Sequence, residues 1–270
     1  MNRTTDNKTT IVNLWQQNLN KSATAQQDLI NSTDPKIYDI LALQEPYIDF
    51  LGNTRTNHNW YPLLPTAHCN NPRKTHAAAF INKHLQSSSW QQNKVNSQDV
   101  VSISINTSAG IIAIFNIYND CDHSRSLHAI WNTLAEDAQS SQLIDLNKMV
   151  WLGDFNWHHP LWDEECNVHL FTTTNLDAAQ ILLDLLAEHD MMMTLLKNTP
   201  TLCASHHKEP NTPRQCFLQR QHLRSHNKMH DIPRPPAPMY IPLFNIQHSR
   251  HLNAPKFRPL KVKLATSQLE

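Results

Sequence analysis

Short apolar runs alternate with helical patterns along the first two thirds of the chain. The apolar or alternating runs predict strands at 10–15, 37–43, 60–62, 76–81, 100–105, 110–117, 149–152 and 191–195. Apolar residues at helical spacing predict helices at 22–30, 124–138 and 174–186. The expected helix N-caps are Ser22, Ser124 and either Thr174 or Asn175. Strands that alternate with helical segments indicate an α/β domain.

The central stretch is a buried strand, 149–152, that runs directly into Gly153-Asp154-Phe155-Asn156. Glycine lets the backbone turn sharply, so the carboxylate of Asp154 and the amide of Asn156 can point into the same cleft. Such a pair suits a phosphate group that needs a metal ion or a polarised water. Gly-Asp-x-Asn is also ordinary turn chemistry, and these residues alone leave that alternative open.

Three earlier strands also end in polar residues. Asn18 and Glu45 follow the first two strands, and Tyr118 follows the strand at 110–117. Glutamate is rarely buried without a partner, so Glu45 is difficult to explain as a core residue. Taken alone, Asn18 is equally well a strand-end amide, and Tyr118 with the Asn and Asp that follow it is equally well a turn.

Together these segments resemble the endonuclease/exonuclease/phosphatase family, and most closely the endonuclease domain of non-LTR (long interspersed) retrotransposons. The segments that carry the resemblance, in the family's order, are Gln17–Ser22, Leu43–Tyr47, Asn116–Asp120 and Gly153–Trp162. The resemblance covers about residues 10–205. It implies a DNase I-like fold, a four-layered α/β sandwich in which two packed mixed β-sheets are flanked by helices.

The resemblance also implies metal-assisted hydrolysis of a phosphodiester, with DNA as the substrate. Glu45 is the implied metal ligand, and Asn18 is implied to hydrogen-bond the carboxylates beside it. Asp154 is implied to orient or deprotonate the attacking water, while Tyr118 and Asn156 stabilise the phosphate in the transition state. Mg²⁺ is the implied cofactor, with Mn²⁺ as an alternative, because Mg²⁺ needs only one or two protein carboxylates.

The adjacent histidines His158 and His159 raise the alternative of a zinc site. Side chains of adjacent residues diverge, and zinc sites need wider spacing with further ligands. The resemblance instead implies that these residues shape the loop around the site.

The pattern changes beyond residue 205. The family's phrase Arg-Pro-Asp-Asn-Val-Phe and its closing Asp-His are absent, and Asp122-His123 is the one Asp-His pair in the sequence. Losing the closing histidine is expected to cost about a hundred- to a thousandfold in rate. Codons for 213–222 can be chosen so that reading one base later spells Pro-Asp-Asn-Val-Phe, which suggests a frame shift.

The expected organisation follows from this change. Residues 1–9 are expected to be disordered, and 10–205 to form the nuclease-like domain. A degenerate segment, frame-shifted or disordered, is expected at 206–239, where Arg, Gln, His and Pro are abundant. A last strand and a tail are expected at 240–270.

Composition narrows the picture further. Lys plus Arg equals Asp plus Glu at 23 each, so a global basic field is excluded and only a local basic patch remains possible. The five cysteines form no Cys-x-x-Cys pair, which argues against a disulfide framework and a zinc knuckle. With no signal peptide and no membrane-spanning run recognised, a soluble intracellular protein is expected, nuclear if it acts on DNA and without a membrane partner.

Three functional hypotheses follow. The chain is a magnesium-dependent DNA endonuclease that nicks target DNA for element insertion, an inactive remnant of one, or a repurposed nucleic-acid-binding protein that uses the basic segment 214–228. No reverse transcriptase segment of a parent element is recognised in the chain.

Overall fold

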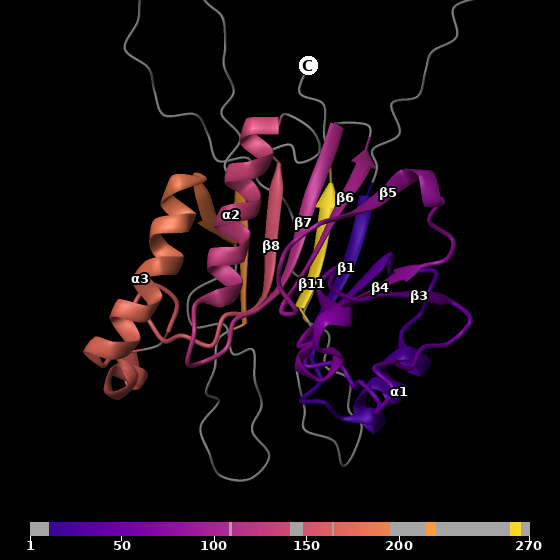
Figure 1. Ribbon diagram of the computed structural model, residues 1–270, viewed down its shortest axis with the longest axis horizontal. Coiled ribbons are helices and arrows are strands. Elements are labelled where there is room, and N and C mark those ends of the chain that lie inside the picture. Colours follow the sequence, from indigo (N-terminus) through magenta and orange to yellow (C-terminus); the bar gives the residue numbers. More distant parts are fainter. Residues whose placement is uncertain are drawn as a thin grey trace, which may run out of the picture.

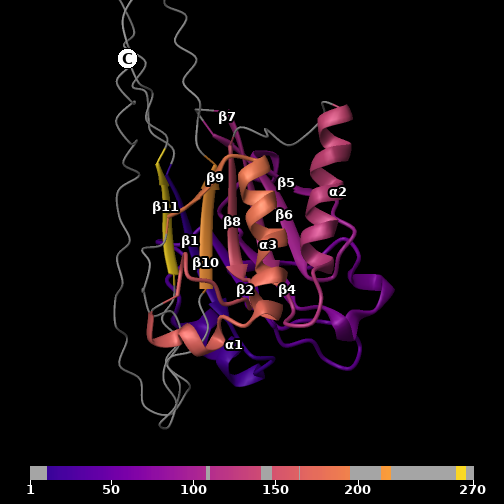
Figure 2. The same cartoon turned by 90° about the vertical axis from the view of Figure 1, so that its left-hand side faces the viewer.

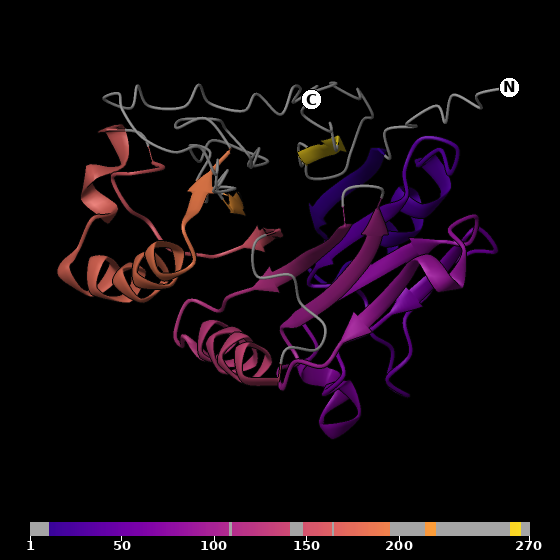
Figure 3. The same ribbon diagram turned by 90° about the horizontal axis from the view of Figure 1, so that it is seen from above.

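The computed structural model describes residues 11–107, 110–140, 148–163, 165–194, 214–219 and 260–265. These residues form two mixed β-sheets that pack against each other, with helices on the outer faces (Figure 1). Seen from above, α1 lies on the opposite side of the molecule from α2 and α3 (Figure 3). The arrangement confirms the expected α/β sandwich of the DNase I type.

The first sheet has the strand order β11-β1-β2-β4-β3. Its strands are β1 (Ile11–Asn18), β2 (Ile40–Gln44), β3 (Trp60–Leu63), β4 (Ala77–Asn82) and β11 (Leu260–Ala265). β1 and β2 are parallel, whereas the other neighbouring pairs are antiparallel. Helix α1 (Ala23–Ser32) covers the outer face and has the predicted N-cap, because the Ser22 hydroxyl accepts a hydrogen bond from the Ala25 amide.

The second sheet has the strand order β5-β6-β7-β8-β10-β9. Its strands are β5 (Trp90–Asn93), β6 (Val100–Thr107), β7 (Gly110–Tyr118), β8 (Met149–Asp154), β9 (Met191–Met193) and β10 (Arg214–Gln219). β7 and β8 are parallel, and the other neighbouring pairs are antiparallel. Helices α2 (Arg125–Ser140) and α3 (Thr173–Glu188) lie side by side on its outer face (Figure 2).

Helix α3 begins slightly earlier than the sequence predicts. Its N-cap is Thr172, whose hydroxyl accepts a hydrogen bond from the Asn175 amide at 3.2 Å, so Thr174 and Asn175 lie inside the helix. The short 3₁₀ helices are η1 (His68–Asn70), η2 (Pro72–Lys74), η3 (Ser87–Ser89) and η4 (Glu165–Leu170). In the described part of the chain, no helix is both long and apolar enough to cross a bilayer.

Alternate residues of the central strands face opposite sides of each sheet, which gives three apolar layers. The layer between the sheets includes Val12, Leu14, Ile40, Ala42, Ala79, Ile81, Ile103, Ile114, Val150 and Leu152. The layer beneath α1 includes Leu29, Ile30, Leu41, Leu43 and Phe80. The layer beneath α2 and α3 includes Phe115, Leu127, Ile130, Trp151, Leu182 and Leu186. Burial on both faces explains why these strands read as continuous apolar runs.

Three buried amides interrupt the apolar layer between the sheets. The Gln16 side chain of β1 donates to Gln44 of β2 at 2.6 Å, and the Gln44 amide donates to the Asn116 carbonyl oxygen of β7. Asn116 in turn donates to the backbone carbonyls of Leu43 at 3.0 Å and Ala78 at 2.8 Å. These hydrogen bonds connect the two sheets directionally, which apolar contacts alone do not.

The segment expected to be degenerate contributes to the second sheet. Residues 214–219, inside the range 206–239, form β10, which is antiparallel to both β8 and β9. β11 lies antiparallel to β1 at 260–265, whereas the last strand expected from about residue 240 lies outside the described residues. The remaining residues of 206–259 and residues 1–9 also lie outside them, and the frame shift stays a hypothesis.

Asn116→Ala tests the connection between the sheets. The substitution leaves the Gln44 amide without its acceptor and removes the donor to two buried carbonyls, so the free energy of unfolding should fall by about 2–4 kcal/mol. Urea denaturation followed by circular dichroism measures this change. The matched control is Asn132→Ala on the exposed face of α2, and equal midpoints for the two variants would contradict the expectation.

Candidate active site

Four of the predicted site residues lie at the carboxyl ends of two parallel strand pairs. Asn18 ends β1 and Glu45 follows β2 in the first sheet, while Tyr118 ends β7 and Asp154 ends β8 in the second. In register, Asn18 pairs with Gln44, and Tyr118 pairs with Asp154. Because the two sheets pack together, these strand ends meet although they come from distant parts of the chain.

The amide of Asn18 connects the two carboxylates. Its Nδ2 atom donates to Asp154 Oδ2 at 2.9 Å and to Glu45 Oε1 at 3.4 Å. Its Oδ1 atom accepts from the backbone N–H of Asn20 at 2.8 Å, which fixes the orientation of the amide. Asn18 and Asp154 are both buried, at 9% and 7% exposure, so this contact between the sheets is largely shielded from water.

The backbone presents Glu45 in an unusual conformation. Glu45 has a positive φ of 46°, in the left-handed region that non-glycine residues seldom adopt. Its N–H donates to the His76 carbonyl at 2.7 Å, and its own carbonyl accepts from the Lys21 N–H at 2.8 Å. These two hydrogen bonds hold the strained residue on both sides, and such strain is concentrated at functional sites.

Gly153 is the position where the central stretch needs a glycine. Its φ is 152°, and a Cβ atom built there would lie 1.8 Å from the Ile117 carbonyl oxygen on the neighbouring strand. The absence of a side chain therefore lets β8 approach β7 closely just before Asp154.

Asn156 is oriented by the backbone around it. It has a positive φ of 56°, its N–H donates to Asp154 Oδ1 at 3.3 Å, and its side-chain amide donates to the Asn119 carbonyl at 2.7 Å. Asn119 is fully buried, donates to the Phe155 carbonyl at 3.2 Å and accepts from the Ser126 hydroxyl at 2.6 Å. The turn interpretation is thus confirmed, and the same turn fixes the orientation of Asp154 and Asn156, whose role in a site stays a prediction.

Tyr118 lies next to Glu45 and keeps its proton. Burial, the charge of Glu45, a hydrogen bond to Glu45 and the charge of Asp154 together raise the pKa of Tyr118 far above its ordinary value. The phenol is therefore a hydrogen-bond donor throughout the physiological range. The same shift shows that the site has a negative electrostatic potential.

A histidine and aspartate pair beside Tyr118 was not recognised in the sequence. The His76 ring lies 5.0 Å from the Tyr118 ring between centroids, and His76 Nδ1 lies 2.7 Å from Asp99 Oδ1. The Asp99 carbonyl also accepts from the Tyr118 N–H at 2.8 Å. His76 begins the strand predicted at 76–81 and was given no role there, and an acidic residue directly before the strand at 100–105 was the available signal.

The two adjacent histidines of the central stretch have structural partners. His158 Nδ1 lies 3.2 Å from Asp163 Oδ2, and the same oxygen accepts from the His159 N–H at 2.8 Å. The His159 ring packs 4.9 Å from the Trp162 ring, and burial lowers the pKa of His159. Within the described residues neither histidine belongs to a cluster of potential metal ligands, so the structure gives no support to the zinc alternative.

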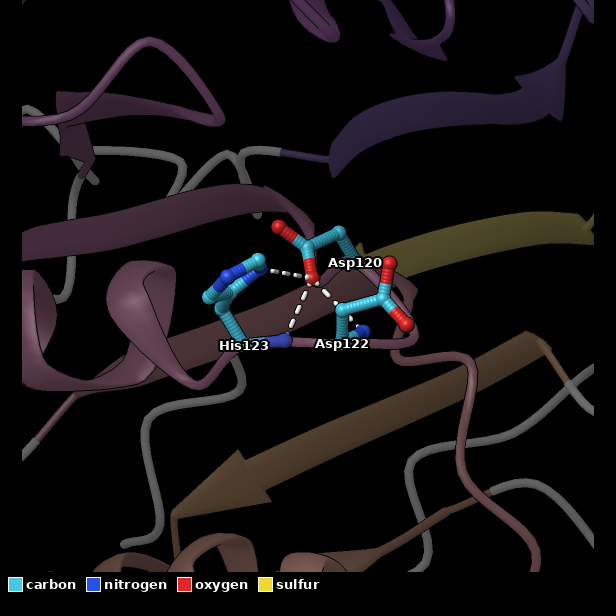
Figure 4. A group of neighbouring side chains, drawn as sticks. All are labelled: Asp120, Asp122 and His123. Atoms are coloured by element: carbon cyan, nitrogen blue, oxygen red, sulfur yellow. Dashed lines mark hydrogen bonds and ion pairs between the residues drawn. The ribbon is translucent and has the colours of Figure 1, made fainter.

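The sequence's one Asp-His pair lies in an exposed turn with Asp120 (Figure 4). Asp120 Oδ1 accepts from the backbone N–H groups of Asp122 and His123, and it lies 3.2 Å from His123 Nδ1. This is ordinary Asx-turn chemistry, in which an aspartate satisfies the backbone that follows it.

The carboxylate and amide oxygens of the site are the donors that hard divalent cations prefer. Glu45 and Asp154 approach the same amide from different sheets, and their combined field is strong enough to shift the pKa of Tyr118. A bound cation would reduce the repulsion between these two carboxylates. The residues present therefore fit a divalent metal ion.

Two layers of strands with helices outside define an α/β sandwich with the fold of DNase I-like proteins, and its polar strand ends meet at one edge. Residues 112–230 match the family model described as Endonuclease-reverse transcriptase. A sequence comparison with curated proteins gives no match. The family match and the structural neighbours below show that the chain is similar to endonuclease/exonuclease/phosphatase proteins and to a retrotransposon endonuclease domain, which confirms the resemblance found in the sequence.

Solved structures of low sequence identity share the fold. The endonuclease domain of TRAS1, a telomere-specific non-LTR retrotransposon, is 15% identical with a TM-score of 0.56, over 77% of this chain and 85% of that chain. The AP endonuclease LMAP from Leishmania major is 9% identical with a TM-score of 0.56, over 77% and 79%. The catalytic domain of Xenopus laevis APE2 is 14% identical with a TM-score of 0.54, over 77% and 82%. Nucleases of this fold generally use divalent metal ions.

Alkaline titration tests the environment of Tyr118. Because its pKa is raised in the folded state, the phenol should stay protonated at pH 11 in native protein but ionise in urea. Tyr118→Phe should therefore lower the phenolate absorbance at 295 nm by one of five tyrosines in urea and leave the native signal unchanged. By linkage, the stability that comes from this shift is complete below about pH 10 and is lost as the pH rises further. A native signal that also falls in Tyr118→Phe would contradict the assignment.

Proposed function

We propose that this protein is a metal-dependent phosphodiesterase that nicks DNA, an endonuclease of the retrotransposon type. The observation that carries the proposal is the bridge through Asn18, which joins Glu45 of one sheet to Asp154 of the other at 3.4 and 2.9 Å. Two carboxylates held close together repel each other, so this arrangement at the strand ends costs stability. A bound cation would remove that cost, which is the physical reason to expect a metal and phosphate site here.

Glu45, with Asn18 in support, would hold Mg²⁺, and Mn²⁺ would suit the same oxygen donors. When bound, the cation supplies Lewis-acid chemistry, which neutralises a non-bridging phosphate oxygen and the leaving group. The left-handed backbone of Glu45, fixed by His76 and Lys21, keeps its carboxylate in one place without a large entropy cost.

Asp154 would orient the attacking water and take its proton. The Asn18 side chain donates to one carboxylate oxygen and the Asn156 N–H to the other, so the carboxylate plane is fixed before substrate binds. Tyr118, held protonated, would donate a hydrogen bond to the phosphate as negative charge develops. Asn156 lies beside both groups and would add a further polar contact.

DNA is the substrate class that the fold neighbours favour. Two of them are an AP endonuclease and the endonuclease domain of a telomere-specific retrotransposon. Cutting chromosomal DNA would place the protein in the nucleus, and a reverse transcriptase of the parent element would be the partner that uses the nick. The closing Asp-His of the family is replaced by Met-Tyr at 239–240, outside the described residues, so we expect a slow enzyme.

A supercoiled-plasmid nicking assay with Mg²⁺ tests the function. Wild type should convert supercoiled plasmid to the open circular form, and Glu45→Ala and Asp154→Ala should each abolish the conversion. Asn18→Ala should lose roughly 10- to 100-fold, the usual effect of removing a group that orients a metal ligand. Calorimetric titration with Mg²⁺ should show weaker binding for Glu45→Ala.

Glu136→Ala on α2 and Asp184→Ala on α3 are the matched controls, since each removes an exposed carboxylate far from the strand ends. Both should nick as wild type does. Folded wild-type protein that leaves the plasmid supercoiled, or nicking that survives both Glu45→Ala and Asp154→Ala, would reject the proposal.

A further inference from the structure

Two adjacent large apolar side chains protrude into solvent on the loop that follows Glu45. Phe50 is 80% exposed and Leu51 is 70% exposed, the highest values among the exposed large hydrophobic residues of the described chain. Folding gains nothing from apolar surface that stays in water. Paired exposure of this kind is typical of a contact site rather than of isolated surface residues.

The tip that carries Phe50 and Leu51 is rigid. Asp49 Oδ1 accepts from the N–H groups of Leu51 at 2.9 Å and Asn53 at 2.8 Å, and the Asp49 N–H donates to the Asn53 carbonyl at 2.8 Å. Gly52 has a φ of 85°, and a Cβ atom there would lie 2.7 Å from Pro72. A preorganised tip contacts a partner without a large ordering cost.

The base of the loop is fixed to the frame of the site. Tyr47, two residues after Glu45, donates its N–H to the Gln26 side chain at 2.8 Å and accepts from the Thr54 hydroxyl at 2.9 Å. The Gln26 amide of α1 donates back to Thr54 at 2.9 Å. Phe50 is five residues from Glu45, so the tip lies within about 18 Å of the candidate metal ligand, the reach of an extended chain.

Two exposed basic residues follow the proline that packs against this loop. Gly52 packs against Pro72, the first residue of η2, whose other two residues are the exposed Arg73 and Lys74. Residues 46–76 contain three Lys or Arg and one Asp or Glu, a local formal charge of +2 in a chain whose total is zero. An apolar tip with cations nearby complements a nucleic-acid duplex, which has phosphates on the outside and stacked bases inside.

We propose that Phe50 and Leu51 form a wedge that inserts between stacked bases of a DNA duplex beside the cleavage position, while Arg73 and Lys74 contact the phosphates. Proteins that insert apolar wedges at base steps unstack and kink the duplex, and the added contacts offset the cost. The inference rests on the proposed function, because a DNA duplex in the site passes close to this loop. It also assigns a role to the exposed Arg73 and Lys74.

A duplex that carries 2-aminopurine at successive positions tests the wedge. The full chain is mixed with the duplex in EDTA at low salt, so that binding is measured without cleavage, and fluorescence reports unstacking. Wild type should raise the fluorescence at one or two neighbouring positions. The Phe50→Ser, Leu51→Ser double variant should abolish the rise and weaken binding roughly 5- to 150-fold, the range for losing one base–aromatic contact.

The matched control is the Ile37→Ser, Trp131→Ser double variant, which removes two other exposed apolar side chains, at 53% and 47%. It should bind and unstack as wild type does. Equal urea midpoints for all three proteins would show that the substitutions leave folding stability unchanged. A difference in binding then reflects the lost side chains.

The outcomes separate this inference from the proposed function. Tight binding with no fluorescence rise, or a rise that survives in the wedge variant, overturns the wedge and leaves the endonuclease proposal standing. A rise that depends on Phe50 and Leu51 in a protein that never nicks plasmid supports the wedge and rejects the endonuclease. Wedge-dependent binding to phosphatidylserine vesicles without any effect on the duplex overturns the wedge in favour of a lipid surface.

Discussion

Hydrogen bonds between buried amides fix how the two sheets of this protein face each other. Apolar contacts favour burial but not one lateral position, whereas an amide that donates and accepts across the interface tolerates little displacement. Gln44 and Asn116 form such a contact in the core, and Asn18 repeats it at the strand ends, where its partner is Asp154. The geometry of the candidate site is therefore inherited from the packing of the sheets. A displacement of one sheet that the apolar layer alone would allow would separate Asn18 from Asp154.

The same arrangement accumulates negative charge. Two carboxylates lie at one strand edge, partly removed from water, and the cost of keeping both ionised is offset by donors rather than by bulk solvent. Asn18 supplies one such donor and Tyr118 the other, and the pKa of Tyr118 is raised first by burial and then by the charges of Glu45 and Asp154. A fold selected for stability alone would not place these charges together. The repulsion between the two carboxylates would be relieved if a divalent cation and a phosphate completed the site.

Sequence patterns predict most strands, the helices and the order of the polar strand ends, because these depend on local periodicity and on the direction of parallel strands. They do not predict contacts between residues that only the fold brings together. The pairing of His76 with Asp99 joins residues that follow different strands, and the left-handed backbone of Glu45 depends on hydrogen bonds from distant segments. β10 was missed because a strand that lies between two neighbours can carry several polar residues when those neighbours supply its backbone hydrogen bonds. The hydrophobic periodicity of a segment does not show which distant strands it will pair with.

The absence of net charge shapes how this chain can engage DNA. Counterion release scales with the number of phosphates neutralised, so a surface with two or three cations gains little from it and loses little in salt. A neutral protein also lacks the long-range field that steers a basic one to its target. Affinity must then come from short-range contacts, and an apolar tip that unstacks bases is one of the few that a small basic patch can accompany. Because unstacking costs least at flexible base steps, such a contact would favour some sequences over others without reading a single base edge.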